Sequence, residues 1–146
     1  MKRILGMSLL ALLVLATALN ASAQADHLNG KWNIEWLKPN GTSYIPPSTN
    51  PITLAVTNNI VSGVYVNDEK EICGVTGITS GAAIAFTVQC PSWKIDFAGT
   101  VTNDLTFGGT YTVPPGGKYV SGTHGYFTAE KSICFLPEGC PNNIVY

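Results

Sequence analysis

Residues 73–90 read CGVTGITS-GA-AIAFTVQC, and this stretch decides the fold. The cysteines at its two ends are equidistant from the dipeptide Gly81-Ala82, and a two-residue hairpin turn often begins with glycine, as a type II′ turn does. Such a turn places Cys73 directly opposite Cys90 on the same face of two antiparallel strands. The spacing therefore predicts a β-hairpin closed by a cross-strand disulfide.

The hairpin register also predicts which residues face each other. On the face that carries the sulfurs, Val75 lies opposite Val88, Gly77 opposite Phe86 and Thr79 opposite Ile84. Two further hairpins follow from the same reasoning, a type I′ turn at Asn58-Asn59 and a looser loop over residues 103–105. The first sets Ile52, Leu54 and Val56 against Tyr65, Gly63 and Val61; the second sets Val101, Gly99, Phe97 and Ile95 against Phe107, Gly109, Tyr111 and Val113.

Apolar and polar residues alternate with period two through most of the chain after residue 25, and no segment there shows helical spacing. Short turns between consecutive strands predict an antiparallel meander, and eight strands can close into a barrel without exposed edges. We therefore expect an all-β, eight-stranded, antiparallel up-and-down β-barrel. The predicted strands are Gly30–Leu37, Ile52–Thr57, Ile60–Asn67, Ile72–Ser80, Ala83–Cys90, Lys94–Thr102, Thr106–Val113 and Gly125–Ser132.

Residues 1–25 have the features of a secretory signal peptide. Lys2 and Arg3 precede an apolar run, and the segment ends in small-residue sites typical of signal cleavage. The run is short for a membrane anchor. No cysteine stands at the cleavage point, so the sequence does not indicate lipid attachment. The sequence thus predicts a signal peptide over 1–25, a single barrel domain over 26–146, and a secreted or periplasmic location without a membrane anchor.

Charge excludes one large class of partners. Without Lys2 and Arg3, the chain has six lysines and nine acidic residues, which gives a net charge of −3. Nucleic acid, which is itself negatively charged, is therefore a poor partner. Charged residues make up only 12% of the chain, and hydroxyl and amide side chains must therefore cover much of the outer surface. Four cysteines in an exported chain are best explained by two disulfides, with Cys134 and Cys140 forming the second.

Gly30-Lys31-Trp32-Asn33 opens the first strand, and Lys131 stands late in the last one. With segments 61–65 and 86–89, this pattern resembles the calycin superfamily, and its short turns favour the avidin-like branch. The resemblance implies a barrel in which Lys131 packs over Trp32. It also implies a site for biotin, but only Tyr65 keeps a biotin-binding residue. Ile34 and Cys90 replace an asparagine and a tryptophan of the family, Trp93 follows Cys90 by three positions, and Asn67 stands where the family has threonine or serine.

The loops predict where a ligand would bind. Connections after the first, fifth and seventh strands include residues 38–51, 91–93 and 114–124, and in a meander these lie at one end, the mouth. Trp32 belongs to the core at the opposite, closed end. Aromatic residues with polar tips can hold a small amphiphilic molecule, or they can simply fill the barrel. The candidate ligand-binding residues at the mouth are Trp36, Tyr65, Asn67, Trp93 and Tyr111, with Ile95 and Val113 beside them.

Little in the sequence indicates catalysis. His27 and His124 are the only histidines, no nucleophile has a recognisable base, and no cofactor or metal is indicated. Asp68, Glu69 and Glu71 are interpreted as a solvated charge run, because their spacing matches no calcium loop. Asn40-Gly41-Thr42 is a glycosylation sequon, meaningful only in a eukaryotic host, whereas the leader looks bacterial.

Two functional hypotheses remain. The first is an exported, non-enzymatic barrel that binds a small apolar or amphiphilic molecule at its long-loop end. The alternative is a secreted interaction module, such as a protease or lysozyme inhibitor, with loops Lys38–Pro51 and Pro114–His124 contacting a protein partner. Self-association is compatible with either. A binder needs a cavity of a few hundred Å³, whereas an inhibitor can have a filled core.

Overall fold

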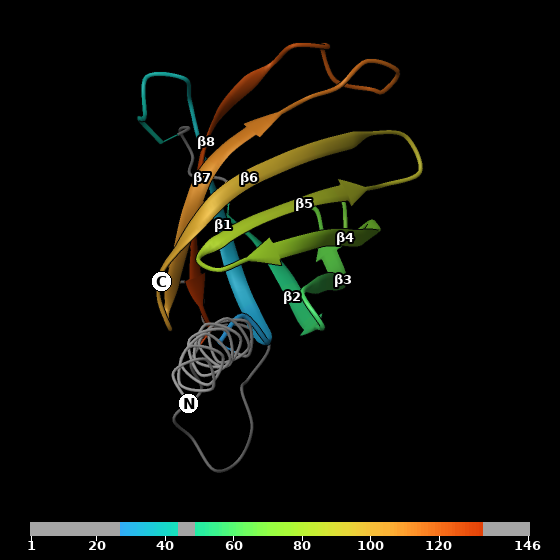
Figure 1. Ribbon diagram of the computed structural model, residues 1–146. Helices are drawn as coiled ribbons and strands as arrows, with labels where there is room; N and C mark the ends of the chain where they lie inside the picture. Colours follow the sequence, from blue (N-terminus) through green and yellow to red (C-terminus); the bar gives the residue numbers. More distant parts are fainter. Residues whose placement is uncertain (1–26, 44–48, 133–146) are drawn as a thin grey trace, which may run out of the picture.

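The computed structural model describes residues 27–43 and 49–132, and it confirms the predicted fold class. Eight antiparallel strands follow one another around a closed barrel, in which β1 pairs with β8 as well as with β2 (Figure 1). Closure joins segments about 100 residues apart, with Trp36 opposite Phe127. The strands are β1 (Gly30–Leu37), β2 (Thr49–Thr57), β3 (Ile60–Val66), β4 (Ile72–Ser80), β5 (Ala83–Gln89), β6 (Lys94–Asn103), β7 (Thr106–Thr112) and β8 (His124–Lys131).

The predicted hairpin registers are confirmed for β2–β3 and β4–β5. Val75 pairs with Val88 and Gly77 with Phe86, and Leu54 pairs with Gly63 across the neighbouring hairpin. Asn58 and Asn59 have φ angles of 51° and 64°, as a type I′ turn requires, and Gly81 has a φ of 56° at the first position of its turn. Turn chemistry and strand alternation thus specify the same register.

The β6–β7 hairpin follows the predicted register except at its two ends. Val101 pairs with Phe107 and Phe97 with Tyr111, but a register irregularity lies between Val101 and Asn103. The Asn103 side-chain oxygen accepts a hydrogen bond of 2.8 Å from the backbone N–H of Leu105, which stabilises the turn locally. At the other end the ladder stops at Asp96 and Thr112, so Ile95 and Val113 are not a paired couple within it.

β2 begins three residues earlier than predicted, at Thr49 instead of Ile52. Pro51 was expected at the end of the preceding loop; proline cannot donate a backbone hydrogen bond to a ladder. In the structure, residues 49–51 pair with β1 only, since the pairing with β3 starts at Ile52. The segment is therefore an edge, where proline is tolerated, and its alternation turns Asn50 into the barrel.

Aromatic side chains fill the barrel from its closed end to its middle. Trp32 is fully buried, its ring contacts that of Phe107 edge-on at 4.8 Å between centroids, and its indole N–H donates to the Leu28 carbonyl oxygen at 2.9 Å. Lys131 Nζ lies 5.2 Å from the centre of the Trp32 ring, as the resemblance implies. Gly77 allows β4 to approach β5 closely, because a Cβ there would lie 2.2 Å from the Ala85 carbonyl oxygen.

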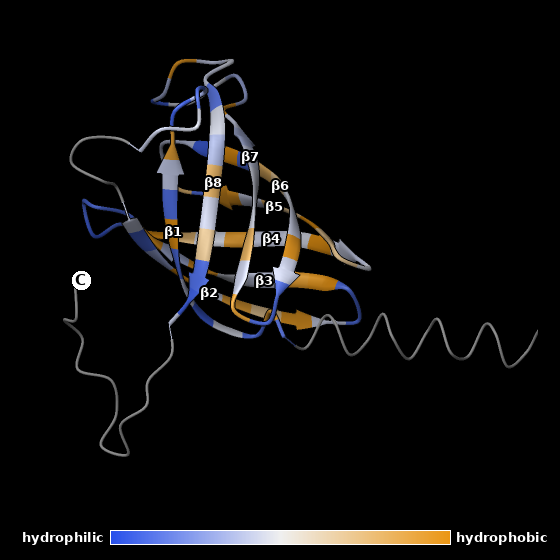
Figure 2. Cartoon of the chain, turned by 90° about the vertical axis from the view of Figure 1, so that its left-hand side faces the viewer, coloured by the Kyte–Doolittle hydropathy of each residue, from blue (hydrophilic) through white to orange (hydrophobic). Residues whose placement is uncertain are grey.

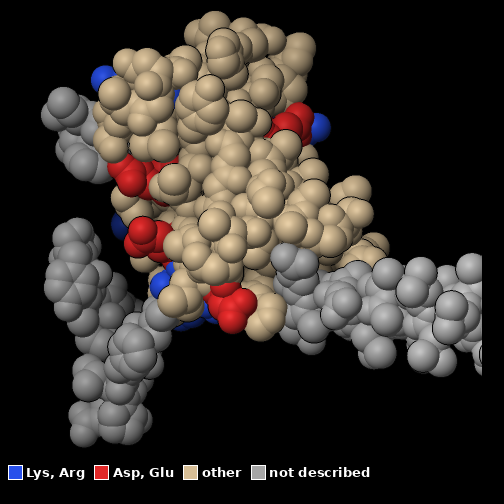
Figure 3. All heavy atoms as spheres, turned by 60° about the vertical axis from the view of Figure 1, so that its left-hand side comes forward, with Lys and Arg blue, Asp and Glu red and all other residues tan. Residues whose placement is uncertain are grey.

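The outer wall carries few charges. Alternation leaves bands of apolar residues along the strands, which Figure 2 shows by hydropathy, while charged side chains are scattered over the face seen in Figure 3. The described residues contain strands and turns but no helix, and hence no helix long and apolar enough to cross a membrane.

All four connections that follow odd-numbered strands lie at one end of the barrel, because the strands alternate in direction. In the part of the chain that the structure describes, they comprise residues 38–43, 67–71, 90–93 and 113–123. In Figure 1 residues 38–43 and the β7–β8 connection are both seen toward the top of the barrel. The turns at the other end have only two residues each, which leaves one wide, loop-lined mouth.

Candidate ligand-binding site

A pocket of about 440 Å³ opens at the mouth. Its volume lies within the range of small-molecule sites. The aromatic packing that fills the closed end therefore stops below the mouth, and the barrel is neither hollow throughout nor filled throughout. The residues that line the pocket are Trp36, Asn50, Tyr65, Asn67, Asp68, Glu69, Trp93, Ile95, Tyr111, Val113, Tyr119, Val120 and Thr123.

Five aromatic rings of the pocket follow one another in edge-to-face contacts. Trp36 lies between two of them, with its ring 4.9 Å from that of Tyr111 and 6.4 Å from that of Tyr65, at interplanar angles of 76° and 85°. Tyr65 continues to Trp93 at 6.0 Å, and Trp93 to Tyr119 at 5.5 Å. Because neighbouring rings are nearly perpendicular, they present faces in more than one direction around the pocket.

Two successive hydrogen bonds connect the Trp36 ring to a carboxylate at the rim of the pocket. The Trp36 indole N–H donates to the side-chain oxygen of Asn50 at 3.1 Å, and the Asn50 amide donates to a carboxylate oxygen of Asp68 at 2.7 Å. Asn50 is buried, so its amide must be bonded, and these two contacts orient it unambiguously. The position of an exposed carboxylate is thereby linked to the orientation of the Trp36 ring in the pocket wall.

Tyr65 contributes a neutral phenol to the pocket wall. Burial raises the pKa of Tyr65 well above its usual range, the negative charge of Asp68 and the neighbouring Tyr119 raise it further, and the Trp36 indole acts in the opposite direction. The phenol therefore keeps its proton at every physiological pH. It can donate a hydrogen bond to a ligand and carries no charge that would repel an anion or attract a cation.

Trp93 lies in the short β5–β6 connection and is held there by its backbone. The carbonyl oxygen of Trp93 accepts hydrogen bonds from the Cys90 backbone N–H at 2.9 Å and from the Gln89 side chain at 3.2 Å. The indole nitrogen of Trp93 is buried and has no hydrogen-bond partner in the described residues. A buried donor that stays unpaired costs free energy.

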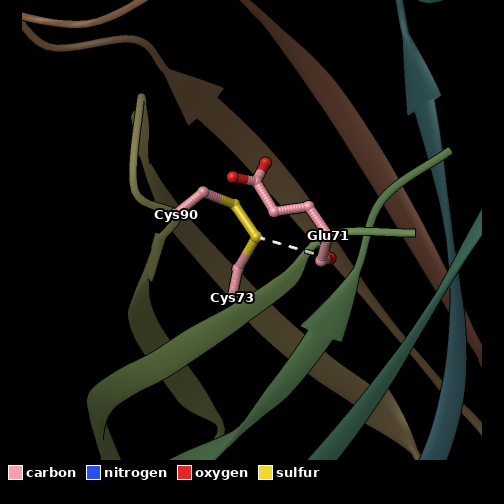
Figure 4. A group of neighbouring side chains, drawn as sticks. All are labelled: Glu71, Cys73 and Cys90. Atoms are coloured by element: carbon pink, nitrogen blue, oxygen red, sulfur yellow. Dashed lines mark hydrogen bonds between the residues drawn. A yellow bond between two sulfur atoms is a disulfide. The ribbon is translucent and has the colours of Figure 1, made fainter. Parts of the chain in front are cut away.

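The disulfide predicted between Cys73 and Cys90 is present and anchors the same connection (Figure 4). The Cα atoms are 4.4 Å apart, both cysteines are buried, and Cys73 Sγ lies 3.8 Å from the Glu71 carbonyl oxygen. Glu71, Cys73 and Cys90 are close enough to resemble a metal-binding group. With both sulfurs in a disulfide, however, neither can act as a thiolate ligand. The second predicted pair, Cys134 and Cys140, lies outside the described residues.

The three carboxylates of the β3–β4 connection have three different partners. Asp68 accepts from Asn50, Glu69 forms an ion pair with Lys118 at 2.8 Å, and Glu71 accepts from the Asn67 amide at 3.0 Å. Asn67 also accepts a bond of 2.8 Å from the Glu71 backbone N–H, which closes the turn. Only Asp68 and Glu69 line the pocket, whereas Glu71 stabilises the connection.

All five predicted ligand-binding residues, Trp36, Tyr65, Asn67, Trp93 and Tyr111, line the pocket, together with Ile95 and Val113. The sequence reasoning missed Asn50, because Pro51 was placed in a loop, although alternation from Ile52 back to Asn50 could have found it. It also missed Asp68 and Glu69, although strand parity alone puts the β3–β4 connection at the mouth. Tyr119, Val120 and Thr123 carried no sequence signal, since alternation does not extend into an irregular loop.

The two histidines are far apart in the fold. His27 lies at the closed end, with its Nδ1 3.3 Å from an Asp104 carboxylate oxygen. His124 lies at the mouth end as the first residue of β8, not in the preceding loop as predicted, and its Nδ1 is 3.1 Å from the Gly122 carbonyl oxygen. Neither histidine lines the pocket.

Comparison of the chain with models of known protein families gives no match, and comparison with curated proteins gives none either.

Proposed function

We propose that this protein is an exported, non-enzymatic β-barrel of calycin type that binds a small apolar or amphiphilic molecule at its long-loop end. The observation that carries the proposal is the pocket of about 440 Å³ at the mouth, lined by five aromatic side chains and a few polar groups. That combination of an apolar lining with sparse, oriented polar atoms is typical of small-molecule sites. Export is supported by the signal-like residues 1–25 and by the disulfide between Cys73 and Cys90.

The ligand would bind against rings whose positions are already set. Trp36 is fixed by Asn50, and the connection that holds Trp93 is tied to β4 by the disulfide. Little side-chain entropy is then lost when a ligand enters, which favours affinity. The phenol of Tyr65 and the amide of Asn67 supply polar atoms that can select among ligands of similar shape.

Titration of tryptophan fluorescence with a panel of neutral and charged aromatic and aliphatic metabolites tests the proposal. We expect a saturable change for at least one compound, weakened by Trp36→Ala and by Tyr65→Phe. Tyr126→Phe is the matched control, because Tyr126 is 45% exposed on the outside of β8. All three variants should keep a cooperative unfolding transition. Absence of saturable binding across the panel, or binding that neither pocket variant weakens, would contradict the proposal.

One observation favours the interaction-module alternative. Val120 is 77% exposed in the β7–β8 connection, next to Tyr119, and an exposed apolar loop residue is a common anchor in protein contacts. Inhibition of secreted proteases or lysozymes that is lost in Val120→Asp would favour this alternative. Inhibition that is absent from the unmodified protein would remove it.

A further inference from the structure

The charged side chains that line the pocket are both acidic. Asp68 and Glu69 line it, and no lysine, arginine or histidine does so within the ranges 27–43 and 49–132. Glu69 is paired with Lys118, and this pair is roughly neutral as a unit. Asp68 accepts only a neutral amide from Asn50 and takes part in no ion pair with another described residue. Of the two acidic side chains that line the pocket, Asp68 is therefore the one without an ion-pair partner among the described residues.

The field of Asp68 reaches into the pocket. Asp68 and Tyr65 line the same pocket, and the charge of Asp68 is one of the causes, after burial, that raise the pKa of the Tyr65 phenol. The Asn50 amide is hydrogen-bonded to both Trp36 and Asp68, and it therefore holds the carboxylate of Asp68 in a fixed position relative to the Trp36 ring. A ligand that contacts Trp36 and Tyr65 would thus lie within the same field.

The aromatic lining adds a second preference of the same sign. The face of an aromatic ring carries partial negative charge and attracts cations, and perpendicular rings around one space form the cages that recognise quaternary ammonium groups. The chain already shows such contacts within itself. Lys118 Nζ lies 6.0 Å from the centre of the Tyr119 ring at the rim, and Lys131 packs over Trp32 in the same way at the closed end.

We infer that the ligand is an organic cation with apolar substituents, such as a quaternary or alkylated ammonium compound, bound among the rings of Trp36, Tyr65 and Tyr111 with Asp68 as its counter-ion. This inference rests on the proposed ligand-binding function and narrows it to one class of molecule. An anion would be repelled by Asp68, because the lysine at the rim, Lys118, is already paired with Glu69. A neutral molecule would gain no attraction from the charge of Asp68. A bare metal ion would leave the apolar lining unused.

A matched pair of ligands separates charge from shape. Acetylcholine and 3,3-dimethylbutyl acetate have the same outline, but only the first carries a positive charge. We expect the oxidised protein to bind acetylcholine at least about tenfold more tightly in calorimetry and tryptophan fluorescence, since a cation enclosed by aromatic faces gains about that much. Raising the sodium chloride concentration should reduce the ratio, because part of it is Coulombic.

Variants then assign the charge. Asp68→Asn should reduce the ratio of the two affinities severalfold, whereas Asp104→Asn should leave it unchanged, because Asp104 is an exposed carboxylate at the closed end. Thermal unfolding of both variants checks that the fold is kept. A ratio that persists in Asp68→Asn would overturn the assignment of Asp68 as the counter-ion.

The outcomes also distinguish the proposed preference for cations from the proposed small-molecule binding function. Equal binding of the charged and neutral ligands would overturn the cation preference and leave the binding function intact. Failure of both ligands while other neutral compounds of the panel bind would have the same meaning. Failure of every compound would overturn both proposals.

Discussion

Removal of the Cys73–Cys90 disulfide should lower stability by an amount that the structure defines. The bond closes a loop with a sequence separation of 17, and in the chain-entropy model a loop of that length stabilises the fold by about 3 kcal/mol. For a domain of this size, that loss corresponds to a fall in melting temperature of about 10 to 15 °C. The perturbation is the double variant Cys73→Ala, Cys90→Ala, whose small side chains fit the two buried positions.

The assay is thermal and urea unfolding of the double variant against the oxidised protein. The urea m-value should rise in the variant, because the unfolded chain is no longer cross-linked and exposes more surface. Adding reductant to the double variant reports separately on Cys134 and Cys140, which we expect to form the second disulfide and which peptide mapping under non-reducing conditions can identify. A fall of less than about 3 °C, with an unchanged m-value, would show that the hairpin register alone holds the strands together and that the entropic argument is wrong for this barrel.

Three further predictions concern the core, the buried phenol and the family resemblance. Trp32→Ala should destabilise the fold by about 3 to 5 kcal/mol in urea unfolding, because the fully buried ring leaves a cavity at the closed end, and an unchanged midpoint would contradict this. The raised pKa of Tyr65 means that above about pH 10 the unfolded chain loses a proton that the folded chain keeps, so stability should fall with rising pH by up to about 1.4 kcal/mol per unit. Tyr65→Phe should flatten that slope, and an identical slope in both proteins would refute the assignment. Biotin should bind no more tightly than about micromolar in calorimetry, because Ile34 is buried and apolar and Cys90 is in the disulfide; nanomolar binding would mean that other residues supply the missing donors.

The sequence predicted the local part of the fold well, for a reason that lies in strand geometry. A period of two and a turn of known length leave only one register for a hairpin, so the partners of Val75, Leu54 and Phe97 could be derived by counting. The same alternation identified the inward aromatic residues of the mouth. It failed where geometry is not periodic, at Pro51 and in the long β7–β8 connection.

The sequence by itself therefore determined the strands, the tight turns, the cross-strand disulfide and the face on which each strand residue lies, because all of these depend on spacing within a few residues. Only the tertiary structure decided the rest. Pairing of β1 with β8 closes the barrel, and the hydrogen bond between Asn50 and Asp68 joins the start of β2 to the β3–β4 connection. The volume of the mouth depends on how far the packed rings rise inside the barrel. That height is set by the simultaneous packing of side chains from all eight strands, which no local pattern encodes.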